Sequence, residues 1–233
     1  MPLGNQLYNM NPKALAAHAA VALIKDGMKV GLGTGSTAYF AIQKIGQRVK
    51  EEGLQVTCIA TSIESEKLAR SLNIPLADFD KLDRLDITID GADEADHNLQ
   101  LIKGGGGALL REKIIAYMTN HYVIIVDESK YVETLGKFHL PVEIIPFGWQ
   151  RTFDLLKAEG ATPNLRQRDN APYITDNGNY ILDCDFGPIK DPRQLQTALN
   201  LIPGVVECGL FIDRTGTLII GYNTGEVKTI NKK

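Results

Sequence analysis

The chain has 233 residues, 44% of them hydrophobic, and its 28 acidic and 25 basic side chains give a formal net charge of -3. A chain of this length buries roughly 70% of its unfolded surface on folding, which is enough for one large domain or two small ones. The sequence has neither the basic stripe of a nucleic-acid-binding protein nor an apolar run long enough to span a membrane, so we expect no nucleic-acid partner and no membrane partner.

Hydrophobic spacing predicts alternating helices and strands in the first half of the chain. The first helix is expected to begin at its N-cap Asn11, with Pro12 in its first turn, and to end just before Gly27. After it we expect strands over residues 28–32, 54–60, 75–79, 85–89, 99–102 and 122–126, and helices over 37–50, 64–72 and 108–119. Such alternation is typical of a doubly wound, mostly parallel sheet, the Rossmann-like class of α/β domain.

The pattern changes after Gly136. Strands are predicted over residues 141–145, 163–168, 173–175, 180–182 and 205–212, and helices over 149–159 and 191–201. Asn177-Gly178 is a strong hairpin signal and is expected to join the strands 173–175 and 180–182. The order β-α-β-β-α-β is that of a ferredoxin-like α+β module. A last strand over 218–222 is expected to return to the first sheet, so we predict a Rossmann-like catalytic domain of residues 1–135 plus 212–233 with an inserted domain of residues 136–211.

The three cysteines, Cys58, Cys184 and Cys208, are odd in number, widely spaced and set in apolar runs. This pattern favours reduced thiols in a protein core over a disulfide framework. The apolar residues near the N-terminus recur at helical spacing and are interrupted by charged residues, unlike the apolar run of a targeting segment. Together these features predict a cytoplasmic protein.

The first motif with chemical meaning is Gly31-Leu32-Gly33-Thr34-Gly35-Ser36-Thr37, between a predicted strand and a predicted helix. Backbone N–H groups and the hydroxyls of Ser36 and Thr37 at a helix N-terminus can hydrogen-bond a phosphate. Ser36 stands where a dinucleotide fingerprint requires glycine, and no Gly-Lys-Ser/Thr of a P-loop follows, so neither NAD nor a nucleotide triphosphate is favoured. A plain strand-to-helix turn is the alternative.

The second motif is Asp90-Gly91-Ala92-Asp93-Glu94, at the end of a predicted strand, where open α/β sheets bind ligands. Asp90 and Asp93 are expected to face one cleft. One alternative is an Asx-type turn in which Glu94 and Asp96 are solvated. Another is a divalent-metal site, because hard cations prefer carboxylate oxygens, but the spacing matches no calcium loop.

The third motif is the segment 103–113, in which Lys103 ends a strand and four glycines precede a helix that carries Glu112. Successive glycines allow backbone N–H groups to approach a ligand, a carboxylate can act as a general base and a lysine can stabilise an oxyanion. Small residues, Ala108 and Ala116, flank Glu112 at helical spacing and leave room for a ligand. The alternative is a surface glutamate paired with a neighbouring arginine or lysine.

Taken together, these motifs resemble the type A ribose-5-phosphate isomerases over nearly the whole chain. The matching segments are GLGTGST at residues 31–37, DGADE at 90–94, KGGGGALLREK at 103–113, DESK at 127–130 and LGKFHLPVEIIP at 135–146. Two residues depart from the family pattern, since Gly107 stands where alanine is usual and Leu110 where threonine is usual. The extra glycine is expected to loosen its turn, and neither departure removes a proton-transfer group.

The resemblance implies an aldose-ketose isomerase that interconverts ribose 5-phosphate and ribulose 5-phosphate through an enediolate, without a cofactor or a metal. It places the general base on Glu112 and further catalytic roles on Asp90, Asp93 and Lys103. The implied substrate-binding residues are Thr34, Gly35, Ser36, Thr37, Asp90, Gly91, Ala92, Asp93, Lys103, Gly104, Gly105, Gly106, Lys130 and Lys13. The family also implies a homodimer or a homotetramer.

Two points stay open from the sequence. Desolvation should raise the pKa of Glu112 while Lys103 should lower it, and the sequence does not decide between them. Other classes with a similar sheet are a sugar-phosphate deaminase, a CoA transferase and the sugar-phosphate sensor domain of a regulator. These explain the Asp90–Asp93 and Lys103–Gly106 motifs less well, and the sensor would not need Glu112.

Overall fold

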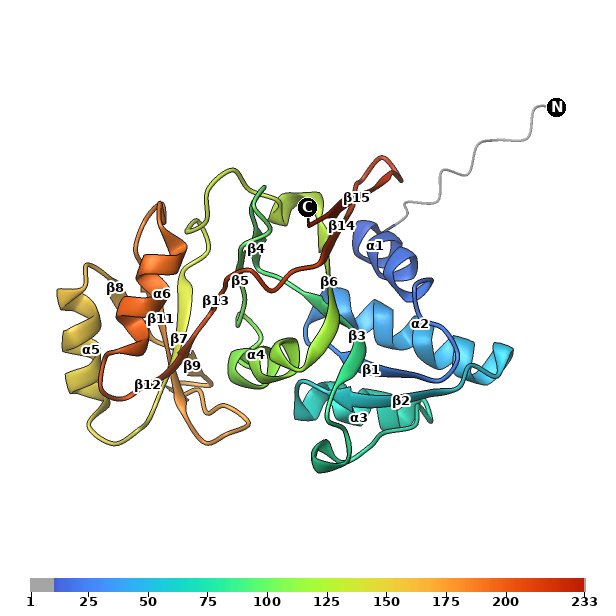
Figure 1. Cartoon of the computed structure of the whole chain (residues 1–233). Helices are drawn as coiled ribbons and strands as arrows, with labels where there is room; N and C mark the ends of the chain where they lie inside the picture. The colour runs from blue at the N-terminus through green and yellow to red at the C-terminus, as the bar shows by residue number, and fades with distance from the viewer. Residues whose placement is uncertain (1–10, 233) are drawn as a thin grey trace.

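The computed structural model describes residues 11–232, in which two large sheets lie side by side (Figure 1). The larger sheet has six strands in the order β15-β14-β6-β3-β1-β2. Their bounds are β1 Met28–Leu32, β2 Val56–Ala60, β3 Leu85–Gly91, β6 Thr119–Asp127, β14 Thr217–Gly221 and β15 Val227–Asn231. All neighbours are parallel except β14 and β15, which are antiparallel. The prediction that the strand near residues 218–222 returns to the first sheet is confirmed.

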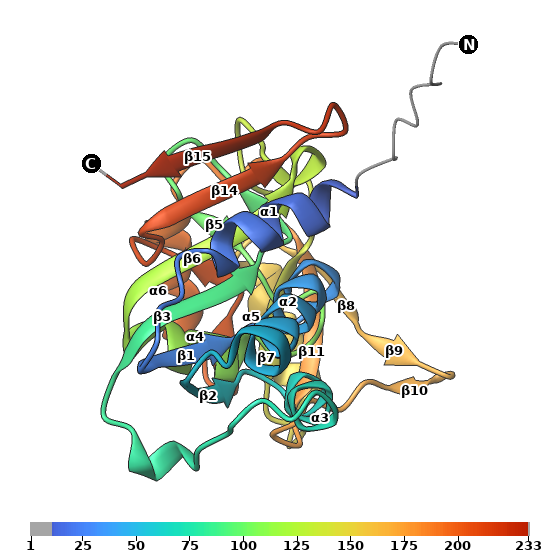
Figure 2. The same cartoon turned by 90° about the vertical axis from the view of Figure 1, so that its right-hand side faces the viewer.

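Helices cover both faces of this sheet, as a doubly wound fold requires. They are α1 Pro12–Val21, α2 Ser36–Glu52, α3 Ile63–Ser71 and α4 Leu109–Tyr117. Because side chains of a strand alternate between the two faces, Val123 and Ile125 of β6 join the hydrophobic cluster of α1 and α2. Ile124 and Val126 join a different cluster with Ala116 of α4. Figure 2 shows α1 lying across the six-stranded sheet.

Helix α1 begins as predicted and ends earlier than predicted. The side chain of Asn11 accepts the backbone N–H of Lys13, so Asn11 is the N-cap. The helix stops at Val21, and Gly27, with φ +79°, lies in a separate turn before β1. Arg48 of α2 donates to the carbonyl oxygens of Val21 and Ile24, which satisfies groups that a longer helix would have used internally.

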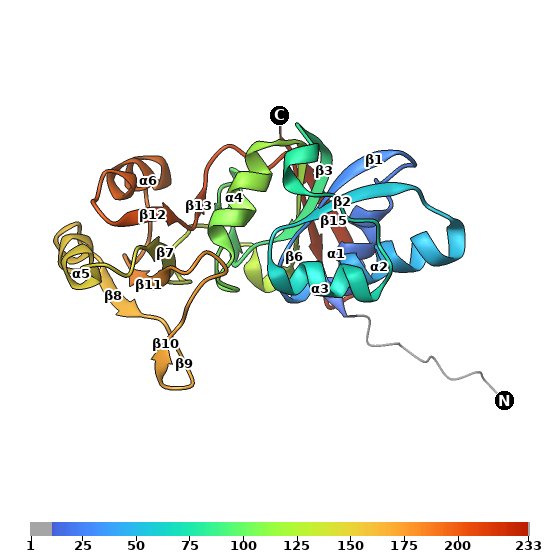
Figure 3. The same ribbon diagram turned by 90° about the horizontal axis from the view of Figure 1, so that it is seen from below.

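The second sheet has four antiparallel strands in the order β12-β7-β11-β8. Its elements are β7 Leu140–Ile144, α5 Trp149–Ala158, β8 Thr162–Leu165, β11 Tyr180–Asp185, α6 Pro192–Asn200 and β12 Val205–Cys208. The β-α-β-β-α-β order confirms the predicted ferredoxin-like module. It has its own hydrophobic cluster, and Figure 3 shows α5 and α6 with its strands at the end of the molecule away from α1 and α2.

The predicted hairpin of this module is misplaced. The tight hairpin joins β9 Gln167–Arg168 to β10 Ala171–Pro172, and its two turn residues, Asp169 and Asn170, both have positive φ. Asn177-Gly178 does form a turn, but residues 173–175 are not a strand and β11 pairs with β8 instead. Glu143 of β7 stabilises this turn, because its carboxylate accepts hydrogen bonds from the Thr175 hydroxyl and the Asn179 side-chain amide.

Two other expectations about strands were wrong, and two features of the sheets were not predicted. In the segment 75–79 only Leu76 makes a bridge, to Cys58, and the short 3-10 helix η1 Phe79–Lys81 follows. The strand 205–212 divides at Gly209, after which β13 Leu210–Phe211 leaves the second sheet. A three-stranded sheet in the order β13-β5-β4, with β5 Leu101–Ile102 and β4 Glu94–Ala95, lies between the large sheets and was not predicted, and neither was β15.

Gly209 explains the division of that strand. Its N–H donates to the carbonyl of Pro141 in β7, and its carbonyl accepts the N–H of Lys103. A Cβ atom at this position would lie 2.2 Å from the Lys103 carbonyl oxygen, so only glycine allows the chain to pass from one sheet to the next. Gly209 thus connects the second sheet by hydrogen bonds to Lys103, the residue that directly follows β5.

The predicted state of the cysteines is confirmed. Cys58, Cys184 and Cys208 are buried and free of disulfide bonds. Burial raises the pKa of the Cys58 thiol to about 12. Among the helices within residues 11–232, none has the length and apolar character needed to cross a membrane.

Candidate active site

The predicted site residues gather in one cavity of about 160 Å³ at the carboxyl ends of β1 and β3. This is the edge at which open α/β sheets bind ligands. The residues that line it are Lys13, Thr34, Gly35, Ser36, Thr37, Gly91, Ala92, Asp93, Lys103, Gly104, Gly105, Gly106, Glu112, Asp127 and Lys130. All predicted site residues are among them except Asp90, which lies beneath the cavity, and Asp127 is an addition.

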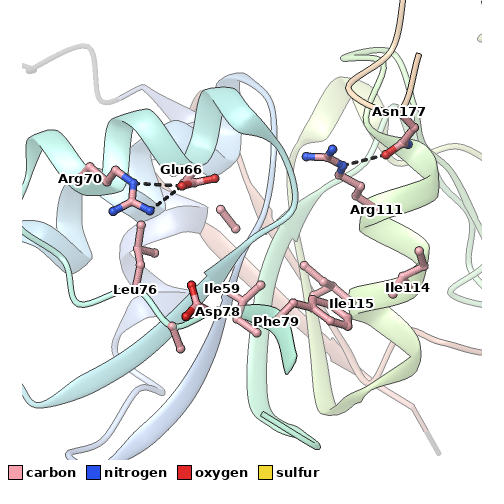
Figure 4. Close-up of a pocket in the computed structure, with 12 residues that line it drawn as sticks. Ile59, Glu66, Arg70, Leu76, Asp78, Phe79, Arg111, Ile114, Ile115 and Asn177 are labelled. Carbon is pink, nitrogen blue, oxygen red and sulfur yellow. Dashed lines mark hydrogen bonds and ion pairs between the residues drawn. The ribbon is translucent and has the colours of Figure 1, made fainter. Parts of the chain in front are cut away.

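A larger cavity of about 480 Å³ lies elsewhere, between α3, the segment 76–79 and α4 (Figure 4). None of the predicted site residues lines it. Its two arginines already have partners, since Arg70 donates to Glu66 and Arg111 donates to Asn177. The predicted acid, base and phosphate-binding side chains thus line the smaller cavity and not this one.

Asp90 forms the floor of the site and is completely buried. Its Oδ1 accepts the backbone N–H groups of Thr34, at 3.0 Å, and Gly91, at 2.8 Å. Its Oδ2 accepts the hydroxyl of Tyr122, at 3.0 Å, and lies 3.1 Å from Lys103 Nζ. Close approach of the two strands depends on Gly33, where a Cβ atom would lie 2.3 Å from Asp90 Oδ1. Both oxygens of Asp90 are thus committed within the protein.

Lys103 is 2% exposed and reaches three oxygens with its ammonium group. It contacts Asp90 Oδ2, Glu112 Oε1 at 3.3 Å and the carbonyl oxygen of Gly91. Burial alone would lower the pKa of Lys103, but the carboxylates of Asp90 and Glu112 raise it above 10.5. A charged lysine is therefore fixed at the wall of the cavity.

Glu112, from the second turn of α4, is the other buried carboxyl group at this wall, 4% exposed. Desolvation raises its pKa to about 8, against the opposing effect of Lys103 and with the help of the Asp90 charge. Desolvation therefore prevails over Lys103. Its Oε2 is buried and has no hydrogen-bond partner among the described residues.

The alternative in which Glu112 is a surface residue paired with a neighbour is wrong. Arg111 donates instead to the side chain of Asn177 and the carbonyl of Asp176. Lys113 is itself buried and donates to Glu207 at 2.8 Å. Both neighbours point away to the second sheet and its turn, which leaves Glu112 facing the cavity.

Asp93 and the glycine turn form the opposite side of the cavity. Asp93 Oδ2 accepts the N–H of Gly105 at 2.7 Å. Desolvation raises the pKa of Asp93, against the hydrogen bond from Gly105 and the charge of Lys103. The N–H of Gly107 closes the turn on the carbonyl of Gly104, whose φ of +106° favours glycine.

Gly107, one of the two departures from the family pattern, has a left-handed backbone conformation. Its φ is +81°, and a Cβ atom there would lie 2.3 Å from the hydroxyl oxygen of Tyr173. The ring of Tyr173 thus occupies the space that an alanine side chain would need. In this chain, the absence of a side chain at position 107 leaves room for the ring of Tyr173.

The glycine-rich loop between β1 and α2 has the groups with which a helix N-terminus binds an anion. Gly35, with φ +97°, is the N-cap of α2 and offers no side chain, so the N–H groups at the start of this helix are open to a ligand. Lys13 Nζ donates to Ser36 Oγ at 2.9 Å, which places a cation beside the same helix end. Thr37 follows in the first turn and also lines the cavity.

Thr34 has a different surrounding from the one expected. Its hydroxyl lies 2.7 Å from the Thr61 hydroxyl and 2.8 Å from that of Ser62, in a buried cluster that also includes Ser65. Its N–H is bound to Asp90. Thr34 lines the cavity, but its hydroxyl joins the loop to the start of α3 and its N–H joins the loop to β3.

Glu94 and Asp96 are buried, so the alternative in which they are solvated turn residues is wrong. Glu94 accepts the backbone N–H groups of Gly136 and Phe138, each at 2.7 Å. Asp96 accepts those of Asn98 and Gln100. Glu94 thus stabilises the loop that precedes β7, and Asp96 stabilises the loop between β4 and β5.

Lys130 and Asp127 close the remaining side of the cavity. Asp127 ends β6 and accepts the N–H of Ser129 at 3.0 Å, which caps the short 3-10 helix η2 Glu128–Lys130. Lys130 Nζ lies 5.6 Å from the centre of the Phe138 ring. The ammonium groups around the cavity suit an anionic group of a ligand, and the carboxyl groups can accept hydrogen bonds from its hydroxyls. Within residues 11–232, no group of three or more histidine, cysteine, aspartate or glutamate side chains is arranged to hold a metal ion.

Comparison with known proteins agrees with this geometry. The family model for ribose 5-phosphate isomerase A (phosphoriboisomerase A) matches residues 57–225. Ribose-5-phosphate isomerase A of Bacillus mycoides is 52% identical over 93% of this chain and 98% of its own. That of Streptococcus agalactiae is 51% identical over 91% of this chain and 96% of its own.

Solved structures agree as well. Ribose 5-phosphate isomerase A of Methanocaldococcus jannaschii superposes with a TM-score of 0.91 at 45% identity, covering 96% of this chain and 100% of that one. A D-ribose-5-phosphate isomerase in complex with phospho-erythronic acid superposes with the same TM-score at 41% identity, covering 94% of this chain and 97% of that one. The chain belongs to the ribose 5-phosphate isomerase A family.

Proposed function

We propose that this protein interconverts D-ribose 5-phosphate and D-ribulose 5-phosphate, a step of the non-oxidative pentose phosphate pathway. One observation supports this most directly: Glu112 is a buried carboxyl group with a pKa of about 8, and its Oε2 has no partner among the described residues. Such a group is suited to take a proton from carbon near neutral pH. The names of the related proteins point to the same reaction.

The phosphate of the sugar binds at the N-terminus of α2. Open N–H groups follow Gly35, and the hydroxyls of Ser36 and Thr37 lie beside them. Lys13 adds a positive charge within hydrogen-bond distance of Ser36. Binding the phosphate here holds the reacting carbons toward Glu112 and lowers the entropic cost of reaction.

Glu112 then removes the proton from C2 of the open-chain aldose and returns it to C1. The hydroxyl proton on O2 moves to O1, so the ketose forms without gain or loss of atoms. Negative charge develops on the enediolate oxygens between the two transfers. Lys103, fixed 3.3 Å from Glu112 Oε1, and the N–H groups of the glycine turn stabilise this charge.

Asp93 and Asp90 have different parts in this proposal. Asp93 lines the cavity and has a raised pKa, so it can exchange a proton with the ring oxygen or the C1 hydroxyl when the furanose opens. Asp90 is completely buried and does not line the cavity. It acts through Lys103, whose charge and direction it holds, and through the Thr34 N–H.

The test is the conversion of ribose 5-phosphate by purified, EDTA-treated protein, followed by the absorbance of ribulose 5-phosphate. Wild type should turn over, and Glu112→Gln should lose about 10²–10⁴-fold in kcat. In D₂O the wild-type product should carry deuterium at C1, because Glu112 exchanges its proton with solvent. Wild type that is folded but inactive with and without added divalent metal would reject the proposal.

We also propose that residues 1–135 plus 212–233 and residues 136–211 act as two domains. Each of the two large sheets has its own hydrophobic cluster, which supports the division. Limited proteolysis should then cut first near residues 136 and 212. Cuts inside either sheet at the earliest times would argue against these boundaries.

A cytoplasmic homodimer or homotetramer is the assembly that we propose. Large exposed apolar side chains on the second-sheet side, Phe147 at 90% and Leu201 at 80% exposure, support association. Light scattering after gel filtration measures the mass directly. A monomer at micromolar concentration would contradict the assembly.

A further inference from the structure

The glycine turn 104–107 raises a physical problem for the proposed reaction. Four successive glycines have no side chains to hold their peptide planes, and glycine adopts positive and negative φ with similar ease. The directions of their N–H groups nevertheless decide whether a developing oxyanion is stabilised. Some other part of the molecule has to fix these directions.

Arg166, between β8 of the second sheet and β9, supplies that restraint. Its Nη1 donates to the carbonyl oxygens of Gly104, at 2.9 Å, and Gly105, at 3.2 Å. Its Nε donates to Asp183 Oδ2 at 2.9 Å, and Nη2 donates to the other oxygen of the same carboxylate. The arginine side chain is 15% exposed. A two-pronged pair with Asp183 therefore aims the third nitrogen of Arg166 at the turn.

The backbone of Arg166 is fixed as well. Its N–H donates to the carbonyl of Ile181 in β11, and its carbonyl accepts the N–H of Tyr173. Both bonds are 2.9 Å long. Arg166 is thus anchored to the second sheet twice, through its backbone and through the pairing of its guanidinium group with Asp183.

The peptide plane between Gly104 and Gly105 is held at both ends. Its carbonyl oxygen accepts from Arg166, and its N–H donates to Asp93. A flip of this peptide would break both bonds at once. Arg166 and Asp93 therefore fix one orientation of a peptide that glycine would otherwise leave free.

The next peptide, between Gly105 and Gly106, is held only at its carbonyl end. Its oxygen accepts from Arg166, and in a trans peptide the N–H points away from the carbonyl. Within residues 11–232 the N–H of Gly106 donates to no protein acceptor, whereas those of Gly105 and Gly107 are both used. Gly106 lines the cavity and Arg166 does not.

We propose that Arg166, held by Asp183, is a positioning residue that turns the Gly106 N–H toward the enediolate oxygen of the substrate. The proposal rests on the proposed isomerase function and deepens it. Arg166 does not touch the substrate. It gives the second sheet a direct part in the reaction, because Asp183 lies in β11 and Arg166 directly follows β8.

The test compares Arg166→Gln with Arg168→Gln, measuring kcat, KM and the affinity for phospho-erythronic acid, the ligand of one related structure. Arg168 is a matched control, since both guanidinium groups lie near the Tyr173 ring, at 4.9 Å for Arg168 and 5.8 Å for Arg166. Of the two arginines, only Arg166 has a hydrogen bond to the glycine turn within residues 11–232.

Arg166→Gln should lower kcat by about 10- to 100-fold with little change in KM, because the Gly106 N–H acts mainly on charge that develops in the transition state. Its affinity for phospho-erythronic acid, whose planar carboxylate resembles the enediolate, should fall with kcat. Asp183→Asn keeps the arginine but weakens the pair that orients its guanidinium group, so it should lower kcat by a smaller factor. Arg168→Gln should match wild type.

A kcat of Arg166→Gln within twofold of wild type, or an equal loss in Arg168→Gln, would overturn the proposal. If Arg166→Gln does not fold, Arg166→Lys decides, since lysine keeps the charge but cannot pair with Asp183 and reach the turn together. Full kcat in that folded variant also overturns it. Inactive wild type would instead reject the isomerase function, and the role of Arg166 with it.

Discussion

The buried Glu112 carboxyl should make the stability of the protein depend on pH in a way that a single substitution removes. In the unfolded chain this group loses its proton near pH 4.5, whereas in the folded protein it keeps the proton until about pH 8. The folded state therefore binds more protons between these values, and rising pH favours unfolding. The glutamine side chain of Glu112→Gln does not ionise, so the free energy of unfolding of this variant lacks the loss that Glu112 causes as the pH rises.

The size of the effect follows from the pKa. Each factor of ten in the ionisation constant corresponds to about 1.4 kcal/mol, so the shift from 4.5 to about 8 costs the folded wild type roughly 3–5 kcal/mol at pH 9. At pH 5, just above the unfolded-state value, the cost is about 1 kcal/mol or less. The free energy of unfolding of Glu112→Gln should thus be close to that of wild type at pH 5 and exceed it by several kcal/mol at pH 9.

Urea unfolding followed by circular dichroism at pH 5, 7 and 9 measures this difference. Glu226→Gln, at an exposed position in the turn between β14 and β15, is the control and should show no such trend. A constant difference between Glu112→Gln and wild type from pH 5 to pH 9 would refute the reasoning. The same ionisation should make the kcat/KM of wild type rise with pH until about pH 8, because the base acts when deprotonated.

Other substitutions test the surroundings of the site. Gly107→Ala should lower the free energy of unfolding by about 1–3 kcal/mol, and adding Tyr173→Ala should recover the part due to the clash but not the part due to φ. Wild-type stability in the single variant would contradict this. Ser36→Ala should raise KM by about tenfold with little change in kcat, and an unchanged KM would remove Ser36 from the phosphate site. Tyr122→Phe deprives Asp90 of a buried hydrogen bond and should cost about 1–3 kcal/mol in urea unfolding, so a neutral effect would show that the bond contributes nothing.

Local signals in the sequence predicted much of the architecture. Asn11 with Pro12 located the start of α1, and the alternation of apolar segments indicated the parallel sheet. The three polar motifs also fell where the cavity is, because the carboxyl ends of parallel strands share one edge of a sheet. These features depend on residues close together in the chain.

The errors came from contacts between distant residues. Asn177-Gly178 has the composition of a hairpin turn, yet residues 173–175 before it form no strand. The turn is stabilised instead by hydrogen bonds to Glu143. The segment 75–79 is apolar enough for a strand but makes one bridge only. In both places tertiary packing overrode the local pattern.

The same reason explains which site residues were missed. Tyr122 lies in an apolar strand, where a buried tyrosine hydroxyl must find a partner, but nothing in the sequence names Asp90 as that partner. Arg166 lies 62 residues from Gly104 in the sequence and has no motif of its own. Thr34 was expected to bind ligand because its position in the loop was visible and its buried hydroxyl neighbours were not.

The position of β14 beside β6 determines the order in which the molecule can be completed during synthesis. Val123 of β6 pairs with Thr217 of β14, so one edge of β6 stays without a partner while the whole second sheet is being made. Helix α1, which carries Lys13, packs against both of these strands. The support for the phosphate end of the cavity is therefore completed only when β14 has been made, although Lys13 precedes both of these strands in the sequence.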